Sequence, residues 1–193
     1  MSVGAIAGMR QFSRDDLFAG LEALADELER RNIYGHVYVV GGAAMAMTFV
    51  PDRMTRDIDA VIERGRSGVM ECVSAVAAKK DWPASWLNDH IAQSVRLVPP
   101  TGDKEARVLW AHKHLLVSGA SPKYLLAMKI RVNRPTDDAD IRVLLDVLGI
   151  RSREEVFAIH DAVFPEWPLA DVEIWSIGRK VEDFLARRAD ERK

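Results

Sequence analysis

The stretch at residues 37–62 constrains the fold more than any other part of the chain. Four apolar residues at 37–40 have the pattern of a buried strand, and the pair Gly41-Gly42 follows them directly. A short run rich in alanine and methionine then predicts a helix, and a second strand is expected to begin at Asp57. A glycine turn between a strand and a helix is therefore followed, one element later, by two acidic residues, Asp57 and Asp59.

The spacing of Asp57 and Asp59 suggests a cation site. Residues two apart in a strand point to the same face, so the two carboxylates would lie together, roughly 6–7 Å apart along the backbone. Two like charges placed this way are unfavourable unless a cation lies between them. A divalent metal is the first hypothesis, and a solvated strand end, a helix cap or an ion-pair element is the alternative.

The glycine pair Gly41-Gly42 suggests an anion site. Free N–H groups at the start of a helix are a natural seat for phosphate oxygens. The alternative is a tight turn that needs glycine for steric reasons only. An anion site beside a cation site is what a nucleoside triphosphate with bound magnesium requires, because the cation bridges phosphate oxygens during displacement.

Composition limits the remaining function classes. The 193-residue chain has a net charge of −2, which does not by itself demand a nucleic-acid partner. Its one cysteine, Cys72, is expected to be a buried hydrophobe in a helix and excludes an internal disulfide framework. The histidines fit no zinc signature, and the five tryptophans are expected to be core or linker anchors rather than base-stacking platforms. With no run of about 20 apolar residues to span a membrane, a cytoplasmic location is expected.

The order of the expected elements predicts a mixed α+β fold. Residues 1–120 form a sheet core with an N-terminal helix, and residues 121–193 form a helical region packed on that core as one compact unit. Strands are expected at 37–40, 57–62, 94–98, 108–110 and 115–117, and helices at 13–32, 67–80, 121–134, 136–148, 152–164 and 171–187. Residues 86–89 are expected to form a loop or a short helix.

Several motifs resemble those of a known family. Gly41-Gly42 followed by Asp57-Ile58-Asp59 is similar to the signature of the polymerase-β-type nucleotidyltransferase superfamily. Residues 121–129, followed by Arg134 and residues 137–141, are similar to the second half of the AbiEii and MenT group of nucleotidyltransferase-like toxins, and Trp86-Leu87-Asn88 to that group's middle segment. The resemblance implies a nucleotidyltransferase-fold sheet core followed by the helical region.

The resemblance also implies roles for individual residues. Asp57 and Asp59 would bind Mg²⁺, with Mn²⁺ as the alternative metal, and Gly41 and Gly42 would bind the nucleotide. Four further residues match functional positions of the family: Thr55 the Ser or Thr before the first aspartate, Lys129 a lysine that contacts nucleotide phosphates, Arg134 an arginine of the nucleotide site, and Asp140 a late helical carboxylate of the catalytic set. From the residues alone, Lys129 could equally be a surface lysine whose stem packs on apolar neighbours, and Asp140 a first-turn carboxylate.

The implied activity is the transfer of NMP from an NTP to an RNA acceptor, with the 3′ end of tRNA as the favoured acceptor and an antitoxin protein as a partner. Many members of the superfamily carry a third carboxylate on a later strand, and residues 93–98 have none. Either Asp140 substitutes for it, the metal alone activates the acceptor, or activity is lost. The competing hypotheses are therefore transfer to a small molecule or a protein side chain, and an inactive module that binds a nucleotide or a partner.

Overall fold

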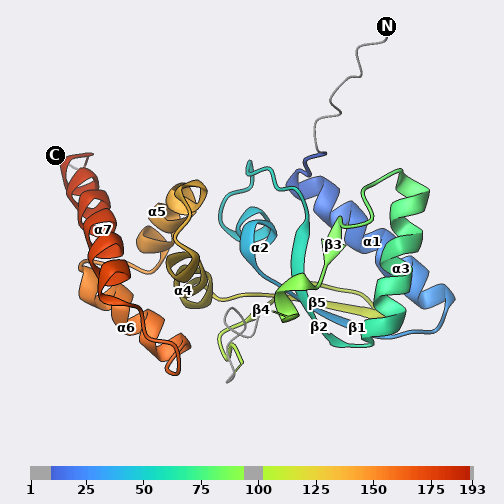
Figure 1. The fold of residues 1–193 in the computed structure, drawn as a ribbon. Helices are drawn as coiled ribbons and strands as arrows, with labels where there is room; N and C mark the ends of the chain where they lie inside the picture. The colour runs from blue at the N-terminus through green and yellow to red at the C-terminus, as the bar shows by residue number, and fades with distance from the viewer. Residues whose placement is uncertain (1–9, 94–101, 192–193) are drawn as a thin grey trace, which may run out of the picture. The chain divides into compact units, whose positions relative to one another are not determined.

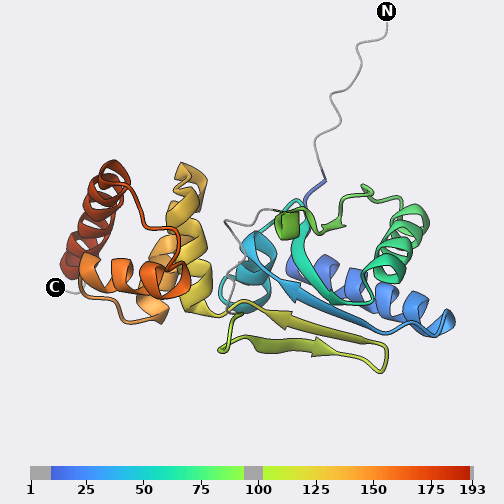
Figure 2. The same ribbon diagram turned by 60° about the horizontal axis from the view of Figure 1, so that its bottom comes forward.

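The structure is a computed structural model that describes residues 10–93 and 102–191. It is mixed α+β, as predicted, with one five-stranded sheet and, in these two ranges, seven α-helices (Figures 1 and 2). The chain divides into a sheet unit, with described residues 10–93 and 108–119, and a helical unit, with described residues 102–107 and 120–191. Whether the two pack as one body stays a prediction. No helix within the described ranges has the length and apolar character needed to cross a bilayer.

The sheet has the strand order β3-β2-β1-β5-β4. Its strands are β1 (Gly35–Val39), β2 (Ile58–Arg64), β3 (Leu87–Asn88), β4 (Arg107–Ala111) and β5 (Leu115–Gly119). The central strand β1 runs antiparallel to β2 and parallel to β5, while β2 runs parallel to the short edge strand β3. The register places Asp59 of β2 opposite Asn88 of β3.

Three α-helices lie in the residues of the sheet unit that the structure describes: α1 (Arg14–Arg30), α2 (Gly41–Thr48) and α3 (Arg66–Lys80). Helices α1 and α3 lie on the same side of the sheet and pack against each other (Figure 2). A capping box lies at the start of α1, where the Ser13 side chain accepts from the backbone N–H of Asp16 and the Asp16 side chain accepts from that of Ser13. The apolar residues Val69, Val73 and Val76 of α3 are buried, and Cys72 on the same helix is buried as predicted.

The described part of the helical unit contains four α-helices: α4 (Pro122–Val132), α5 (Asp138–Val147), α6 (Arg153–Val163) and α7 (Asp171–Glu191). Ser121 and Ser152 cap α4 and α6 with their side chains, as their sequence positions predict. Gly149 follows α5 with a φ of 65°, which is the left-handed conformation expected of a helix-terminating glycine.

The structure corrects three predicted elements. Residues 87–88, expected in a loop or short helix, form the edge strand β3, because Ile58 donates its N–H to the carbonyl of Trp86 and aligns the segment with β2. A short 3₁₀ helix, η2 (Pro135–Asp137), precedes α5 at the start of the helix predicted for 136–148. Helix α7 continues beyond residue 187 to Glu191. The strand expected at residues 94–98 lies outside the described residues.

Candidate functional site

The glycine turn after β1 brings the start of α2 against β2. Val40 is extended, Gly41 has a φ of 62°, and α2 begins at Gly41. The N–H of Val40 donates to the carbonyl of Asp59 over 2.9 Å, which fixes the end of β1 beside the start of β2. A Cβ placed on Gly41 would lie 3.5 Å from Oδ2 of Asp59. The turn therefore needs glycine for its backbone conformation, and it directly borders one of the two predicted metal ligands.

Gly42 lies against the side chains of Thr55 and Arg53, whereas Gly41 lies against Asp59. A Cβ at this position would lie 2.9 Å from Oγ1 of Thr55 and 3.2 Å from a terminal nitrogen of the Arg53 guanidinium. Nε of Arg53 donates to the carbonyl of Gly42 over 3.4 Å. Thr55, predicted to bind nucleotide, thus lies against the glycine turn, and Arg53 adds a cation there.

Asp57 and Asp59 lie close enough for their charges to interact. Asp59 is the second residue of β2, Asp57 immediately precedes the strand, and both side chains are half-buried. Burial raises the pKa of Asp57 above its usual range, the charge of Asp59 raises it further, and Arg56 and a hydrogen bond from Asn88 oppose the rise. The environment thus disfavours the negative charge of Asp57 unless a cation offsets it.

Asn88 of β3 is a site residue that sequence reasoning missed. Its side chain is 5% exposed, its Nδ2 donates to Oδ2 of Asp57 over 3.2 Å, and its Oδ1 accepts from the backbone N–H of His90 over 3.2 Å. These two bonds fix the amide in one orientation. Strand β3, which pairs with β2, therefore contributes an amide to the site. The third carboxylate that many members of the superfamily carry was expected on a later strand, and residues 93–98 have none. The available signal was the apolar pair Trp86-Leu87 directly before a polar residue.

Lys129 and Asp140 form a buried ion-pair cluster in the helical unit. Lys129 of α4 is 6% exposed, and its Nζ lies 2.6 Å from Oδ2 of Asp140, in the first turn of α5, and 2.7 Å from Oδ1 of Asp137. Asp140 is 2% exposed. Lys129 is thus not a surface lysine, and its ammonium is already neutralised by two carboxylates. Arg134 is exposed and immediately precedes the short helix η2.

The predicted site residues therefore occur in two groups. The sheet unit brings together five of them: Gly41, Gly42, Thr55, Asp57 and Asp59. The helical unit brings together Lys129 and Asp140 and also carries Arg134. The functional roles that the resemblance implies for the second group stay predictions.

The group in the sheet unit has the composition of a partial metal site. No set of three or more His, Cys, Asp or Glu side chains suited to a metal occurs in the described parts of the chain. Mg²⁺ is commonly bound through one or two carboxylates together with substrate phosphates and water, so the Asp57 and Asp59 pair has a suitable donor set for it. Such a pair would bind Mg²⁺ together with a phosphate ligand.

Comparison with known proteins gives one match. No curated protein and no solved structure matches the chain. The sequence model of a family described as nucleotidyltransferase of unknown function (DUF6036) matches residues 16–157, which include the glycine turn, the aspartate pair and the Lys129 cluster. Because this match covers most of the 193 residues, the chain belongs to the nucleotidyltransferase family DUF6036.

Proposed function

We propose that this protein is a Mg²⁺-dependent nucleotidyltransferase that moves NMP from an NTP to an RNA acceptor, the 3′ end of tRNA. We further propose that it acts as the toxin of a toxin–antitoxin pair. The family supports the reaction class. The RNA acceptor, the toxin role and an antitoxin partner rest on the resemblance to the AbiEii and MenT toxins.

One observation carries the proposal within the sheet unit. Helix α2 begins at Gly41, and a Cβ on Gly41 would lie 3.5 Å from a carboxylate oxygen of Asp59. The helix N–H groups that would hold an anion therefore border the carboxylate pair. A triphosphate with its cation is a ligand that satisfies both, since its oxygens accept hydrogen bonds and also ligate the metal.

Each residue of the site would have a separate role in the reaction. Asp57 and Asp59 would hold Mg²⁺, which, when bound, would neutralise charge on the triphosphate. The N–H groups of Gly41 and Gly42 would donate to phosphate oxygens, and the guanidinium of Arg53 would add a positive charge beside them. The Asn88 amide would keep Asp57 in position. The acceptor hydroxyl oxygen would bond to the α-phosphorus as its proton passes to solvent water, and the bond from the α-phosphorus to the bridging oxygen would break to release pyrophosphate.

The experiment that tests the proposal follows labelled phosphate to its acceptor. Each of the four α-³²P-labelled NTPs is incubated with Mg²⁺, cellular RNA and either the wild-type protein or Asp59→Asn. We expect label on RNA from at least one NTP with the wild-type protein and a loss of about a hundredfold or more with Asp59→Asn, because the metal-binding charge is halved. Label on protein or on small molecules but not on RNA would redirect the proposal to another acceptor.

A second candidate function is favoured by Asn88. The strand beside the aspartate pair presents an amide where a third carboxylate could act as a base, so the fold could bind a nucleotide without transferring it. This inactive module predicts saturable NTP binding with no label transfer to any acceptor. The same set of incubations, combined with equilibrium NTP binding, separates the two candidates.

A further inference from the structure

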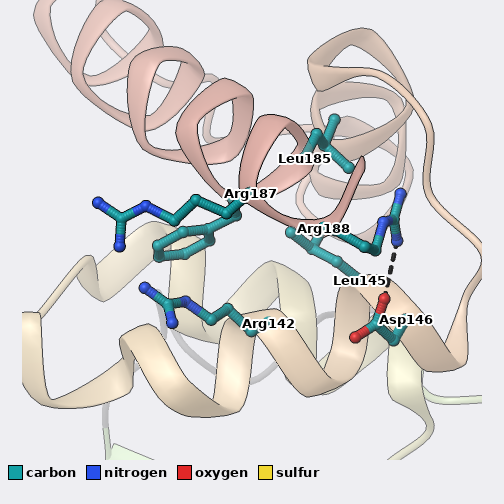
Figure 3. A pocket seen from close by; sticks show the side chains of 7 residues that line it. Arg142, Leu145, Asp146, Leu185, Arg187 and Arg188 are labelled. Atoms are coloured by element: carbon teal, nitrogen blue, oxygen red, sulfur yellow. Dashed lines mark hydrogen bonds and ion pairs between the residues drawn. The ribbon is translucent and has the colours of Figure 1, made fainter. Parts of the chain in front are cut away.

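An open groove lies between α5 and α7 of the helical unit, and none of its lining residues belongs to the proposed nucleotide site. The groove has a volume of about 440 Å³, and its lining includes Arg142, Trp175, Arg179, Lys180, Phe184 and Arg187. We call it the α5–α7 groove. A smaller pocket, nearer the C-terminal ends of α5 and α7, is also lined by Arg142, Phe184 and Arg187, and Arg188 lines it as well (Figure 3).

The groove concentrates positive charge in a chain that is acidic overall. Together the two hollows are lined by five cationic side chains, Arg142, Arg179, Lys180, Arg187 and Arg188, and by three carboxylates, Asp138, Asp146 and Asp183, which leaves a local excess of two positive charges. The whole chain has a net charge of −2. The excess is thus a local feature and not a reflection of composition.

Three of the arginines in this groove have no carboxylate partner among the described residues. Lys180 pairs with Asp138 over 2.8 Å and Arg188 with Asp146 over 2.9 Å, which leaves Arg142, Arg179 and Arg187. All three are exposed, and Figure 3 shows the guanidinium groups of Arg142 and Arg187 projecting to the same side of the pocket. Unpaired guanidinium groups that converge in this way suit the oxygens of phosphate groups.

Trp175 gives the groove an aromatic surface as well. It was expected to be a core or linker anchor, and the structure corrects this, because its side chain is 63% exposed on the first turns of α7. The guanidinium of Arg179 lies 5.3 Å from its ring centroid, and that of Arg142 lies 4.4 Å from the Phe184 ring. Exposed aromatic rings between arginines are the combination by which proteins hold unpaired bases and their phosphates.

We propose that the α5–α7 groove binds a single-stranded segment of nucleic acid, with phosphates on Arg142, Arg179 and Arg187 and a base stacked on Trp175. A duplex fits this arrangement poorly, because its bases are already stacked and a tryptophan face cannot reach them. The identification of the strand as acceptor RNA rests on the proposed function. The binding site itself rests on the groove alone.

Equilibrium binding without catalysis tests the inference. A fluorescein-labelled 12-nucleotide single-stranded RNA is titrated with the intact protein in EDTA and without NTP, and anisotropy is followed at several salt concentrations. Log K for RNA binding falls as log salt concentration rises. Replacing Arg142, Arg179 and Arg187 together by Gln should reduce the magnitude of this slope by about 2, since each phosphate contact on a single strand contributes about 0.7. Trp175→Leu should weaken binding by about fivefold or more, and Trp175→Phe should retain most of the affinity.

Arg151→Gln is the matched control, because Arg151 is exposed in the helical unit but does not line the groove. It should change the affinity little. Thermal unfolding of each variant checks that its fold is intact. An equal effect of Arg151→Gln and the groove variants, tighter binding of a duplex, or no binding of the single strand would overturn the inference.

Comparison with the labelled-NTP experiment separates the two proposals. Loss of RNA binding in the groove variants together with no nucleotide transfer by the wild-type protein would support the groove and reject the proposed function. Transfer that depends on Asp59 together with unaltered RNA binding in the groove variants would support the function and reject the groove.

Discussion

The charge of Asp57 is held in an unfavourable environment. Its pKa is raised by burial and by the neighbouring Asp59, so folding favours the protonated form. Stability associated with this group is present below the ordinary pKa of 3.8 and is lost as the pH rises through the higher pKa of the folded state. At neutral pH, ionised Asp57 therefore destabilises the metal-free protein.

Asp57→Asn should accordingly raise the free energy of unfolding at pH 7 in EDTA. The gain should shrink as the pH falls and vanish below the ordinary pKa of 3.8, where the wild-type carboxyl is also neutral. Chemical denaturation at a series of pH values measures both effects. A variant that is less stable than the wild type at pH 7 would contradict this electrostatic description of the site.

Gly41 offers a test of the turn, and Gly149 is its matched control. Their φ angles are 62° and 65°, but a Cβ on Gly149 would meet no atom within 4 Å, whereas one on Gly41 would contact Asp59. Either glycine replaced by alanine should cost about 1 kcal/mol of stability, because an L-residue is strained in this conformation. Only Gly41→Ala should also lower nucleotide transfer. Equal loss of transfer in both variants would show that the effect is global.

At the scale of elements, α1 and α3 are joined by a buried carboxylate. Glu27 of α1 is 2% exposed, accepts from Nζ of Lys79 in α3 over 2.7 Å and also accepts from Arg30 and Arg31. The hydrogen bond from Lys79, followed by that from Arg30, lowers the pKa of Glu27 to about 2. Its contribution to stability is therefore complete above the ordinary pKa of 4.5 and is lost as the pH falls towards 2.

Glu27→Gln should lower the free energy of unfolding at pH 7 by about 1 to 2 kcal/mol, a modest value because the three cations are partly exposed and screened by solvent. The difference from the wild type should narrow between pH 4 and pH 2. Glu22→Gln, at an exposed position of the same helix, is the control and should change stability little. Urea unfolding at both ends of this pH range measures the loss.

Helices α4 and α5 are joined by the Lys129 cluster. Lys129→Met would leave the buried carboxylate of Asp140 without its cation, and the expected cost is about 3 kcal/mol or more. The double variant Lys129→Met with Asp140→Asn should recover part of that loss, because the uncompensated charge is also removed. Denaturant unfolding of the single and double variants checks the coupling. Additive losses would mean that the pair does not interact energetically.

Local sequence signals were sufficient to predict most of these elements. The side-chain caps at Ser13, Ser121 and Ser152 and the left-handed Gly149 each follow from short-range chemistry, and the structure confirms them. The strand β3 was missed because two residues carry no periodic pattern, and its pairing is set by a distant strand. Residues 87–88 form a strand because they pair with β2, and not because of a local sequence pattern.

For the whole molecule, the sequence predicted which residues form the site better than it predicted the contacts among them. The proximity of Gly41, Thr55 and Asp59 follows from the strand–turn–helix order, and the structure brings them together as expected. The contributions of Asn88 and Arg53 depend on strand order and on a turn, and no short-range pattern specifies either. The exposure of Trp175 likewise depends on which face of α7 packs within the helical unit.

In the proposed function, the aspartate pair beside the glycine turn is what makes nucleotide transfer to RNA possible. The most direct measurement is the rate of Mg²⁺-dependent label transfer from α-labelled NTP to purified tRNA by the wild-type protein, Asp57→Ala and the control Asp52→Ala, which alters an exposed aspartate in a nearby turn. We predict transfer by the wild-type protein and by Asp52→Ala, and a loss of about a hundredfold or more in Asp57→Ala. Transfer by Asp57→Ala at the wild-type rate would contradict the claim.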